Sequence, residues 1–295
     1  MLFRTLLIVA VSANAAAAQN RNYPPEFPEA RAEVYKTIGD VKLNIYIFSP
    51  KDQDKKVRPA VVFFFGGGWR SGTPAQFHQH CKHLASRGIV AMTADYRVST
   101  RNNTKATACV ADAKSAIRWV RQNAKRLGID PERVAAGGGS AGGHLAACTG
   151  VIRGFEEKGE DLSISSVPNA LILFNPALVL AELEGEPPLS PKQMEGLPER
   201  MGTAPKNLSP FHHVAKGAPP TIIFHGKADS TIPYKTAEQF TAAMKREGNE
   251  CELQGFDDQA HGFFNYGRGD GSHYETTVKQ MDGFLISLKY IKAKK

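Results

Sequence analysis

Apolar residues are distributed along the chain in two alternating patterns. Short, nearly continuous apolar runs occupy residues 58–65, 89–94, 169–174 and 220–226. Runs of this kind are typical of strands that are buried on both faces of a parallel sheet. Between them, apolar positions recur every three or four residues, as at Ala116, Val120 and Leu127, and this spacing predicts helices with one buried face.

The expected elements alternate along the chain after a proline-rich start. Residues 32–40 and 41–50 show period-two patterning around a Gly-Asp turn and predict a hairpin. Further strands are expected at residues 58–68, 88–97, 133–138, 169–174, 220–226 and 251–256. Helices are expected at residues 74–88, 113–127, from about 141, 233–247 and 274–290. This alternation predicts an α/β protein with a mostly parallel central sheet of about eight strands, flanked by helices on both faces.

Residues 177–208 interrupt the alternation. They are rich in prolines and acidic residues and show no clear strand period. We expect them to form a small cap-like insertion after the sixth strand rather than a second domain. The predicted organisation is a lead segment at residues 19–31 and one domain at residues 32–295 that contains the insertion.

The first 18 residues have the pattern of a signal peptide. Arg4 supplies a positive start, residues 6–11 are apolar, and Ala16 and Ala18 fit the small-residue cleavage rule. This apolar run is far shorter than the roughly 20 residues that a bilayer span requires. We therefore expect cleavage near Ala18, export to the periplasm or the outside of the cell, and no membrane span.

Composition and charge narrow the range of partners. With 42% hydrophobic and 22% charged residues, the chain resembles an ordinary globular protein. The formal net charge of +8 comes from dispersed lysines and arginines without a basic stripe, so no nucleic-acid partner is expected. The charge supports at most weak attraction to anionic polymers such as an acidic polysaccharide. None of these patterns indicates an oligomeric state.

The chain contains four cysteines: Cys81, Cys109, Cys148 and Cys251. None is part of a C-x-x-C pair, so neither a zinc site nor a redox motif is expected. Export permits disulfides, and the sequence leaves open a bridge between Cys81 and Cys109.

Glycines surround one serine between an expected strand and an expected helix. Gly138, Ser140 and Gly142 form a G-x-S-x-G motif in the strand-turn-helix context that this motif requires. Such a sharp turn lifts the hydroxyl to the edge of the sheet, next to the unpaired N–H groups of a helix N-terminus. A helix-capping serine in a glycine turn is the alternative, but the context favours a nucleophile.

A serine nucleophile requires a histidine that takes its proton and a carboxylate that orients the histidine. His261 lies in an expected loop after the last strand, whereas His144 and His225 are expected to be structural or to line a wall. Asp229 follows the strand at residues 220–226, at the sheet edge where the other two groups emerge. Asp257 and Asp258 lie too near His261 in sequence to approach its far nitrogen easily. The order Ser140, Asp229, His261 matches the order of a hydrolase triad.

A tetrahedral oxyanion also requires N–H donors. We expect the donors to be Ala141, after the serine, and Gly67 and Gly68, after the strand at residues 58–65, because backbone without side chains can approach a substrate oxygen closely. Trp69 and Phe263 are candidates for the substrate pocket, although an aromatic side chain at either position is about as often part of a core.

Together these residues resemble a known family. "GGGW" at 66–69, "DYR" at 95–97, "DAKSAIRWV" at 112–120, "GGSAGGHLA" at 138–146, Asp229 and "HGF" at 261–263 resemble the hormone-sensitive-lipase-like branch of the α/β-hydrolases, which includes acetyl esterases. The resemblance covers roughly residues 32–292. It implies the α/β-hydrolase fold, a metal-free and cofactor-free carboxylesterase, and structural roles for Asp112 and Arg97. More narrowly, the chain resembles secreted bacterial esterases that remove acetyl or feruloyl groups from xylan.

One position departs from the family pattern. Phe65 occupies the position at which the family usually has the histidine of an H-G-G-G motif. That histidine normally braces the loop without entering the triad, so the resemblance implies that packing holds the loop here.

The sequence therefore predicts a serine esterase for short acyl esters, with acetyl or feruloyl esters of carbohydrates as the first candidates. Two alternatives remain. One is a serine peptidase of the prolyl-oligopeptidase type, although the chain has no room for the large gating domain of those enzymes. The other is a noncatalytic binding protein on a hydrolase fold, against which the complete set of serine, histidine and acid argues.

Overall fold

The computed structural model describes residues 23–51 and 57–293. Eight strands form one sheet in the order β1-β2-β4-β3-β5-β6-β7-β8. They are β1 (Arg31–Ile38), β2 (Val41–Phe48), β3 (Arg58–Phe64), β4 (Val90–Ala94), β5 (Ile129–Gly139), β6 (Ala170–Phe174), β7 (Thr221–Gly226) and β8 (Cys251–Phe256). The pairs β1-β2 and β2-β4 are antiparallel and all the others are parallel. This is the α/β-hydrolase fold that the sequence predicts.

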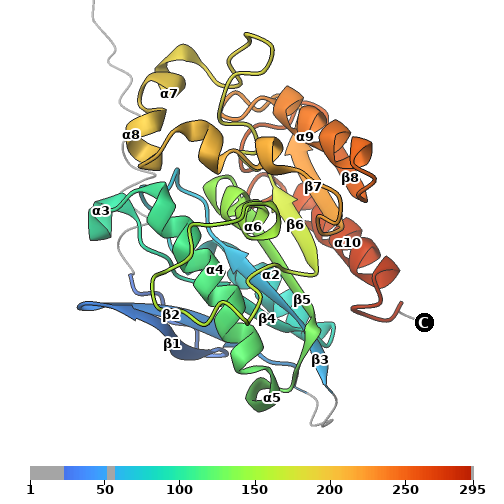
Figure 1. Ribbon diagram of the computed structural model, residues 1–295. Helices are drawn as coiled ribbons and strands as arrows, with labels where there is room; N and C mark the ends of the chain where they lie inside the picture. The colour runs from blue at the N-terminus through green and yellow to red at the C-terminus, as the bar shows by residue number, and fades with distance from the viewer. Residues whose placement is uncertain (1–22, 52–56, 294–295) are drawn as a thin grey trace, which may run out of the picture.

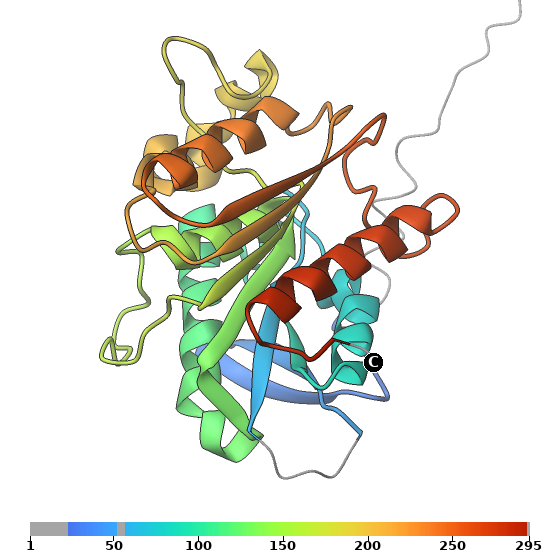
Figure 2. The same ribbon diagram turned by 90° about the vertical axis from the view of Figure 1, so that its right-hand side faces the viewer.

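Helices cover both faces of the sheet (Figures 1 and 2). On one face, α4 (Ala106–Gln122), α6 (Ala141–Val151) and α9 (Tyr234–Arg246) contribute to a core that includes Val62 and Phe64 of β3. On the other face, α2 (His78–Ser86) and α10 (Ser272–Ser287) pack with Val61 and Phe63. Alternate residues of a strand point to opposite faces, so a continuous apolar run supplies both cores.

The central helix is longer than the apolar spacing suggested. The helix α4 begins at Ala106 instead of residue 113, because Cys109 and Val110 continue its buried face. It ends at Gln122, and a short helix, α5 (Ala124–Leu127), follows and is closed by the left-handed Gly128. A glycine tolerates this conformation at a helix end better than any other residue.

Residues 177–208 fold into short helical pieces beside the carboxyl ends of the parallel strands (Figure 1). These are α7 (Pro191–Glu195), α8 (Leu197–Met201) and η2 (Pro205–Leu208), followed by η3 (Pro210–His213). Leu189, Leu197, Met201 and Leu208 are buried in the same core as α4 and α6. The insertion is thus packed onto the main domain through its own apolar side chains.

All four cysteines are free and buried. Cys81 belongs to the core beneath α2 and α10, whereas Cys109 belongs to the core on the opposite face. The bridge that the sequence left open is therefore excluded, because the sheet separates the two sulfur atoms. The expected signal peptide at residues 1–18 lies outside the described residues and stays a prediction. Within residues 23–51 and 57–293, no helix has the length and apolarity of a bilayer span.

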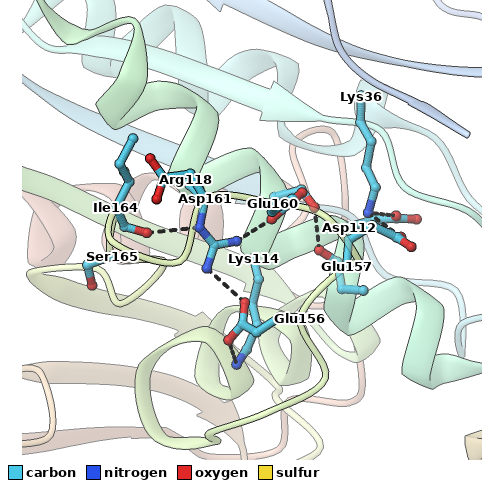
Figure 3. A network of polar contacts seen from close by, with 12 residues as sticks. Lys36, Asp112, Lys114, Arg118, Glu156, Glu157, Glu160, Asp161, Ile164 and Ser165 are labelled. Carbon is cyan, nitrogen blue, oxygen red and sulfur yellow. Dashed lines mark hydrogen bonds and ion pairs between the residues drawn. The ribbon is translucent and has the colours of Figure 1, made fainter.

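A network of buried charges fastens the segment after α6 to α4 (Figure 3). Asp112 binds Lys36 Nζ at 2.7 Å and Arg97 Nη2 at 2.8 Å, which agrees with the structural roles implied by the family resemblance. Glu156 bridges Lys114 at 2.7 Å and Arg118 at 2.8 Å. Each buried cation in this network has a carboxylate partner, as buried charges require.

Candidate active site

Ser140 occupies the sharp turn between β5 and α6. Its backbone has φ of 53° and ψ of −120°, a conformation that costs energy for a residue with a side chain. The turn is held because the Ser140 N–H donates to the Phe174 carbonyl at 2.8 Å, and the Ser140 carbonyl accepts from His144 N–H at 2.9 Å. The hydroxyl is thereby presented at the carboxyl edge of the sheet.

The glycines around Ser140 let the turn approach strand β3. A Cβ at Gly142 would lie 2.0 Å from the Phe64 carbonyl oxygen, and one at Gly138 would lie 2.5 Å from the same atom. Real Cβ atoms do not approach backbone this closely. The motif is therefore a steric requirement of this turn, as the sequence predicted.

The structure joins two of the three predicted triad residues directly. His261 Nδ1 lies 2.7 Å from Asp229 Oδ2, across a separation of 32 residues. The other carboxylate oxygen, Asp229 Oδ1, accepts from the N–H groups of Thr231 at 2.8 Å and Ile232 at 2.9 Å. Ser140 and His261 line the same cavity. In the described part of the chain no hydrogen bond joins the Ser140 hydroxyl to His261, and such contacts often tighten only when substrate is bound.

The environment of Asp229 keeps it ionised. Burial alone would raise the pKa of this carboxyl, but hydrogen bonds from His225, His261 and the Ile232 N–H, together with the charge of His261, hold the pKa well below its usual range. Burial lowers the pKa of His144 to about 4, so that ring is neutral at pH 7. Its Nδ1 accepts from Trp69 Nε1 at 3.1 Å, and its Nε2 lies 2.7 Å from the Leu208 carbonyl. His144 is thus a structural link between α6, the glycine loop and the insertion.

The sequence did not predict two of the contacts that Asp229 makes. Asn175, at the end of β6, donates from Nδ2 to Asp229 Oδ2 at 2.7 Å. His225 Nε2 lies 3.4 Å from the same oxygen and 2.9 Å from the Ile232 carbonyl. The signal for Asn175 was present, because an amide side chain directly after a buried parallel strand lies at the same edge as Asp229. Asn175 has φ of 42°, a left-handed conformation that asparagine tolerates better than most residues.

We expect Asn175→Asp to lower kcat/KM for 4-nitrophenyl acetate about tenfold or more, because a second carboxyl would replace an N–H donor at Asp229. Like charges raise carboxyl pKa values, so Asp229 would stay protonated up to a higher pH in the variant and would lose the charge that stabilises the reacting imidazole. This effect moves the acid limb of the pH profile to higher pH. The measurement is kcat/KM against pH, with Asn169→Asp, which lies away from the cavity, as the control. An unchanged acid limb would show that Asn175 does not influence the pair formed by Asp229 and His261.

The glycine loop after β3 has the backbone geometry of a donor loop. Gly67 and Gly68 have φ of 129° and 62°, and a Cβ on Gly67 would lie 2.2 Å from the Ser71 carbonyl oxygen. The Gly66 N–H already donates to Gln76 Oε1 at 2.6 Å. No residue of the described chain accepts from the N–H of Gly67 or Gly68. These two groups and the N–H of Ala141, the first residue of α6, border the cavity beside Ser140.

Phe65 braces the glycine loop by packing. Its ring stacks on Tyr96 with centroids 4.1 Å apart, and the Tyr96 hydroxyl donates to the Phe65 carbonyl at 2.7 Å. A chain of side-chain hydrogen bonds also braces the loop. Gln76 Nε2 donates to Asn265 Oδ1 at 2.9 Å, and Asn265 Nδ2 donates to the carbonyl of Gly262 at 2.8 Å. The donor loop is thus tied to the residue that follows His261.

A cavity of about 890 Å³ opens over these groups. Trp69 lines it, and the same side chain, 5% exposed, also belongs to the core. The prediction for Phe263 is wrong, because its side chain is only 3% exposed and packs against Phe256, with centroids 4.6 Å apart, in the core beside α10. Its neighbour Phe264 lines the cavity instead. Adjacent aromatic residues point in different directions, and the spacing in the sequence does not say which of them faces the site.

The chain is similar to several families and solved structures. The family described as BD-FAE matches residues 43–244, and the dienelactone hydrolase family matches residues 202–288. Thermogutta terrifontis esterase 2 phosphonylated by sarin shares 52% sequence identity with a TM-score of 0.90, over 92% of this chain and 100% of that one. The propionate-bound form of the same esterase gives a TM-score of 0.87 at 52% identity, over 93% and 100% of the two chains.

Curated relatives are more distant. Esterase LipC of Mycobacterium tuberculosis is 27% identical over 74% of this chain and 56% of its own length. A probable isoprenylcysteine alpha-carbonyl methylesterase of Arabidopsis thaliana is 29% identical over 78% of this chain and 50% of its own length. The chain therefore spans about half the length of the curated relatives that it matches.

Proposed function

Because the chain belongs to the BD-FAE family of α/β-hydrolase esterases, we propose that it is a serine carboxylesterase for short-chain acyl esters. One observation carries the proposal. His261 Nδ1 lies 2.7 Å from Asp229 Oδ2, and His261 lines the cavity that Ser140 and the glycine loop also line. This arrangement suits acyl transfer, in which a serine, a base and oxyanion donors act on one carbonyl carbon.

In the proposed mechanism, the Ser140 oxygen attacks the ester carbonyl carbon while His261 takes the hydroxyl proton. Asp229 holds the imidazole in place and stabilises its charged form. The N–H groups of Gly67, Gly68 and Ala141 bind the oxyanion of the tetrahedral intermediate. His261 then gives the proton to the departing alcohol. Water repeats the steps on the acyl-serine and releases the acid.

We propose acetyl and feruloyl esters of carbohydrates as the substrates. The match to the BD-FAE family supports this class, and the propionate-bound and butyrate-bound forms of Thermogutta terrifontis esterase 2 support a short acyl group. The cavity lining includes the apolar side chains of Trp69, Leu189 and Ile232, which suit an acyl chain.

A chain-length series tests the function. We expect kcat/KM for 4-nitrophenyl esters of linear acids to be highest between acetate and butyrate and to fall by about tenfold or more at octanoate, because the propionate-bound and butyrate-bound forms of Thermogutta terrifontis esterase 2 support a site for a short acyl chain. Acetylated and feruloylated xylo-oligosaccharides then identify the natural class. Cleavage of proline-containing peptides without ester hydrolysis would contradict the proposal and favour a peptidase.

A further inference from the structure

The cavity wall carries two arginines and no acidic residue. Within the described chain, Arg200 and Arg268 line the cavity, whereas no aspartate or glutamate does so. Arg200 lies in α8 of the insertion. Arg268 lies in the segment after His261, where its Nη1 is 3.7 Å from the position of a Cβ built on Gly262. One cation is thus on the insertion side, and the other is beside the residue that follows His261.

Neither guanidinium has a partner in residues 23–51 and 57–293. Arg97 and Arg118, whose side chains are 15% and 4% exposed, behave differently, since both bind carboxylates. The glutamate next to Arg200 is also engaged elsewhere, because Glu199 binds Lys105 Nζ at 3.1 Å. The two cavity arginines therefore keep all their donors available.

A second positive charge lies near Arg200. Burial, and then the charge of Arg70, lower the pKa of the Arg200 guanidinium. Arg70 is exposed and directly follows Trp69 of the glycine loop. Cations without counterions at a binding cavity raise the local concentration of anions. Since arginine binds a carboxylate through two parallel hydrogen bonds, an acidic ligand would relieve this imbalance.

We propose that the alcohol part of the substrate is an acidic oligosaccharide, whose uronic-acid carboxylates are bound by Arg200 and Arg268. This inference rests on the proposed esterase function and narrows its substrate class. We assign the carboxylates to the alcohol part of the ester, rather than to its acyl group, for two reasons. Trp69, Leu189 and Ile232 of the cavity lining suit an acyl group, and Arg268 is exposed, so it can contact a long alcohol that extends out of the cavity. The net charge of +8 favours the same class of polymer.

A matched pair of substrates tests the inference. One is an acetylated xylo-oligosaccharide that carries glucuronic acid, and the other is the same material after chemical reduction of its carboxyl groups to alcohols. We expect the full-length wild-type chain to release acetate from the acidic form with a kcat/KM about tenfold higher, and this preference to shrink with added salt. If the ratio of kcat/KM for the acidic form to kcat/KM for the reduced form is near one, the inference is overturned.

Variants then separate local binding from general attraction. In Arg200→Gln/Arg268→Gln the ratio of the two kcat/KM values should fall to near one. Arg153→Gln, which removes an exposed arginine outside this cavity, should keep the wild-type ratio. The two arginines would not be the carboxylate site if the double variant kept the wild-type ratio, whether its activity was unchanged or fell equally on both substrates. The same conclusion would follow if Arg153→Gln lowered the ratio as much as the double variant. If neither oligosaccharide nor 4-nitrophenyl acetate is hydrolysed at all, the proposed function itself fails.

Discussion

Replacing Ser140 by alanine is expected to lower kcat for 4-nitrophenyl acetate by at least about 10⁴-fold while the chain stays folded. The hydroxyl is the only side-chain group in the proposed mechanism that forms a bond to the substrate carbon. Its loss leaves only the oxyanion donors and substrate binding, which accelerate hydrolysis weakly. The free energy of unfolding should change by less than about 1 kcal/mol, because the hydroxyl has no hydrogen-bond partner within the described residues.

Reaction with an organophosphate gives a second measurement. Since the proposed mechanism makes Ser140 an activated nucleophile, we expect paraoxon, which phosphorylates such serines, to inactivate this chain and to label the Ser140 peptide in mass spectrometry. Ser163→Ala, at an exposed serine in the segment after α6, is the control and should behave as wild type. Turnover retained by Ser140→Ala, or label on another residue, would remove Ser140 from the mechanism.

The second large effect concerns folding. Gly142→Ala should lower the free energy of unfolding by about 3 kcal/mol or more, because the added Cβ would lie 2.0 Å from the Phe64 carbonyl and 2.4 Å from the Phe65 carbonyl. Neither backbone group can yield without moving β3 and the glycine loop. Activity should fall with stability, since the same shift displaces Ser140 from Gly67 and Gly68.

Denaturant unfolding of a matched glycine variant checks this reasoning. Gly283 lies in α10, where a Cβ would meet nothing within 4 Å. Gly283→Ala should raise the free energy of unfolding by about 0.5–1 kcal/mol, because alanine loses less backbone entropy in a helix. Equal destabilisation by both substitutions, or a Gly142→Ala variant as stable as wild type, would refute the steric explanation.

Features encoded in neighbouring residues were predictable. The strand runs, the helix periodicity and the G-x-S-x-G turn at Ser140 depend on local backbone geometry, so the sequence by itself determined them. The positions of Asp229 and His261 also followed, because residues that come directly after parallel strands meet at one edge of the sheet. For the same reason, the fold and the 2.7 Å contact between these two side chains agree with the sequence prediction.

Tertiary structure alone decided which distant side chains meet. It placed Asn175 against Asp229, turned Phe264 instead of Phe263 into the cavity, and set Cys81 and Cys109 on opposite faces of the sheet. It also left Arg200 without a partner among the described residues, although Glu195 and Glu199 lie close before it in the sequence. Spacing along a chain describes the direction of a side chain only within its own helix or strand. Contacts between elements depend on sheet register and on how loops pack, and those are settled only when the whole core is formed.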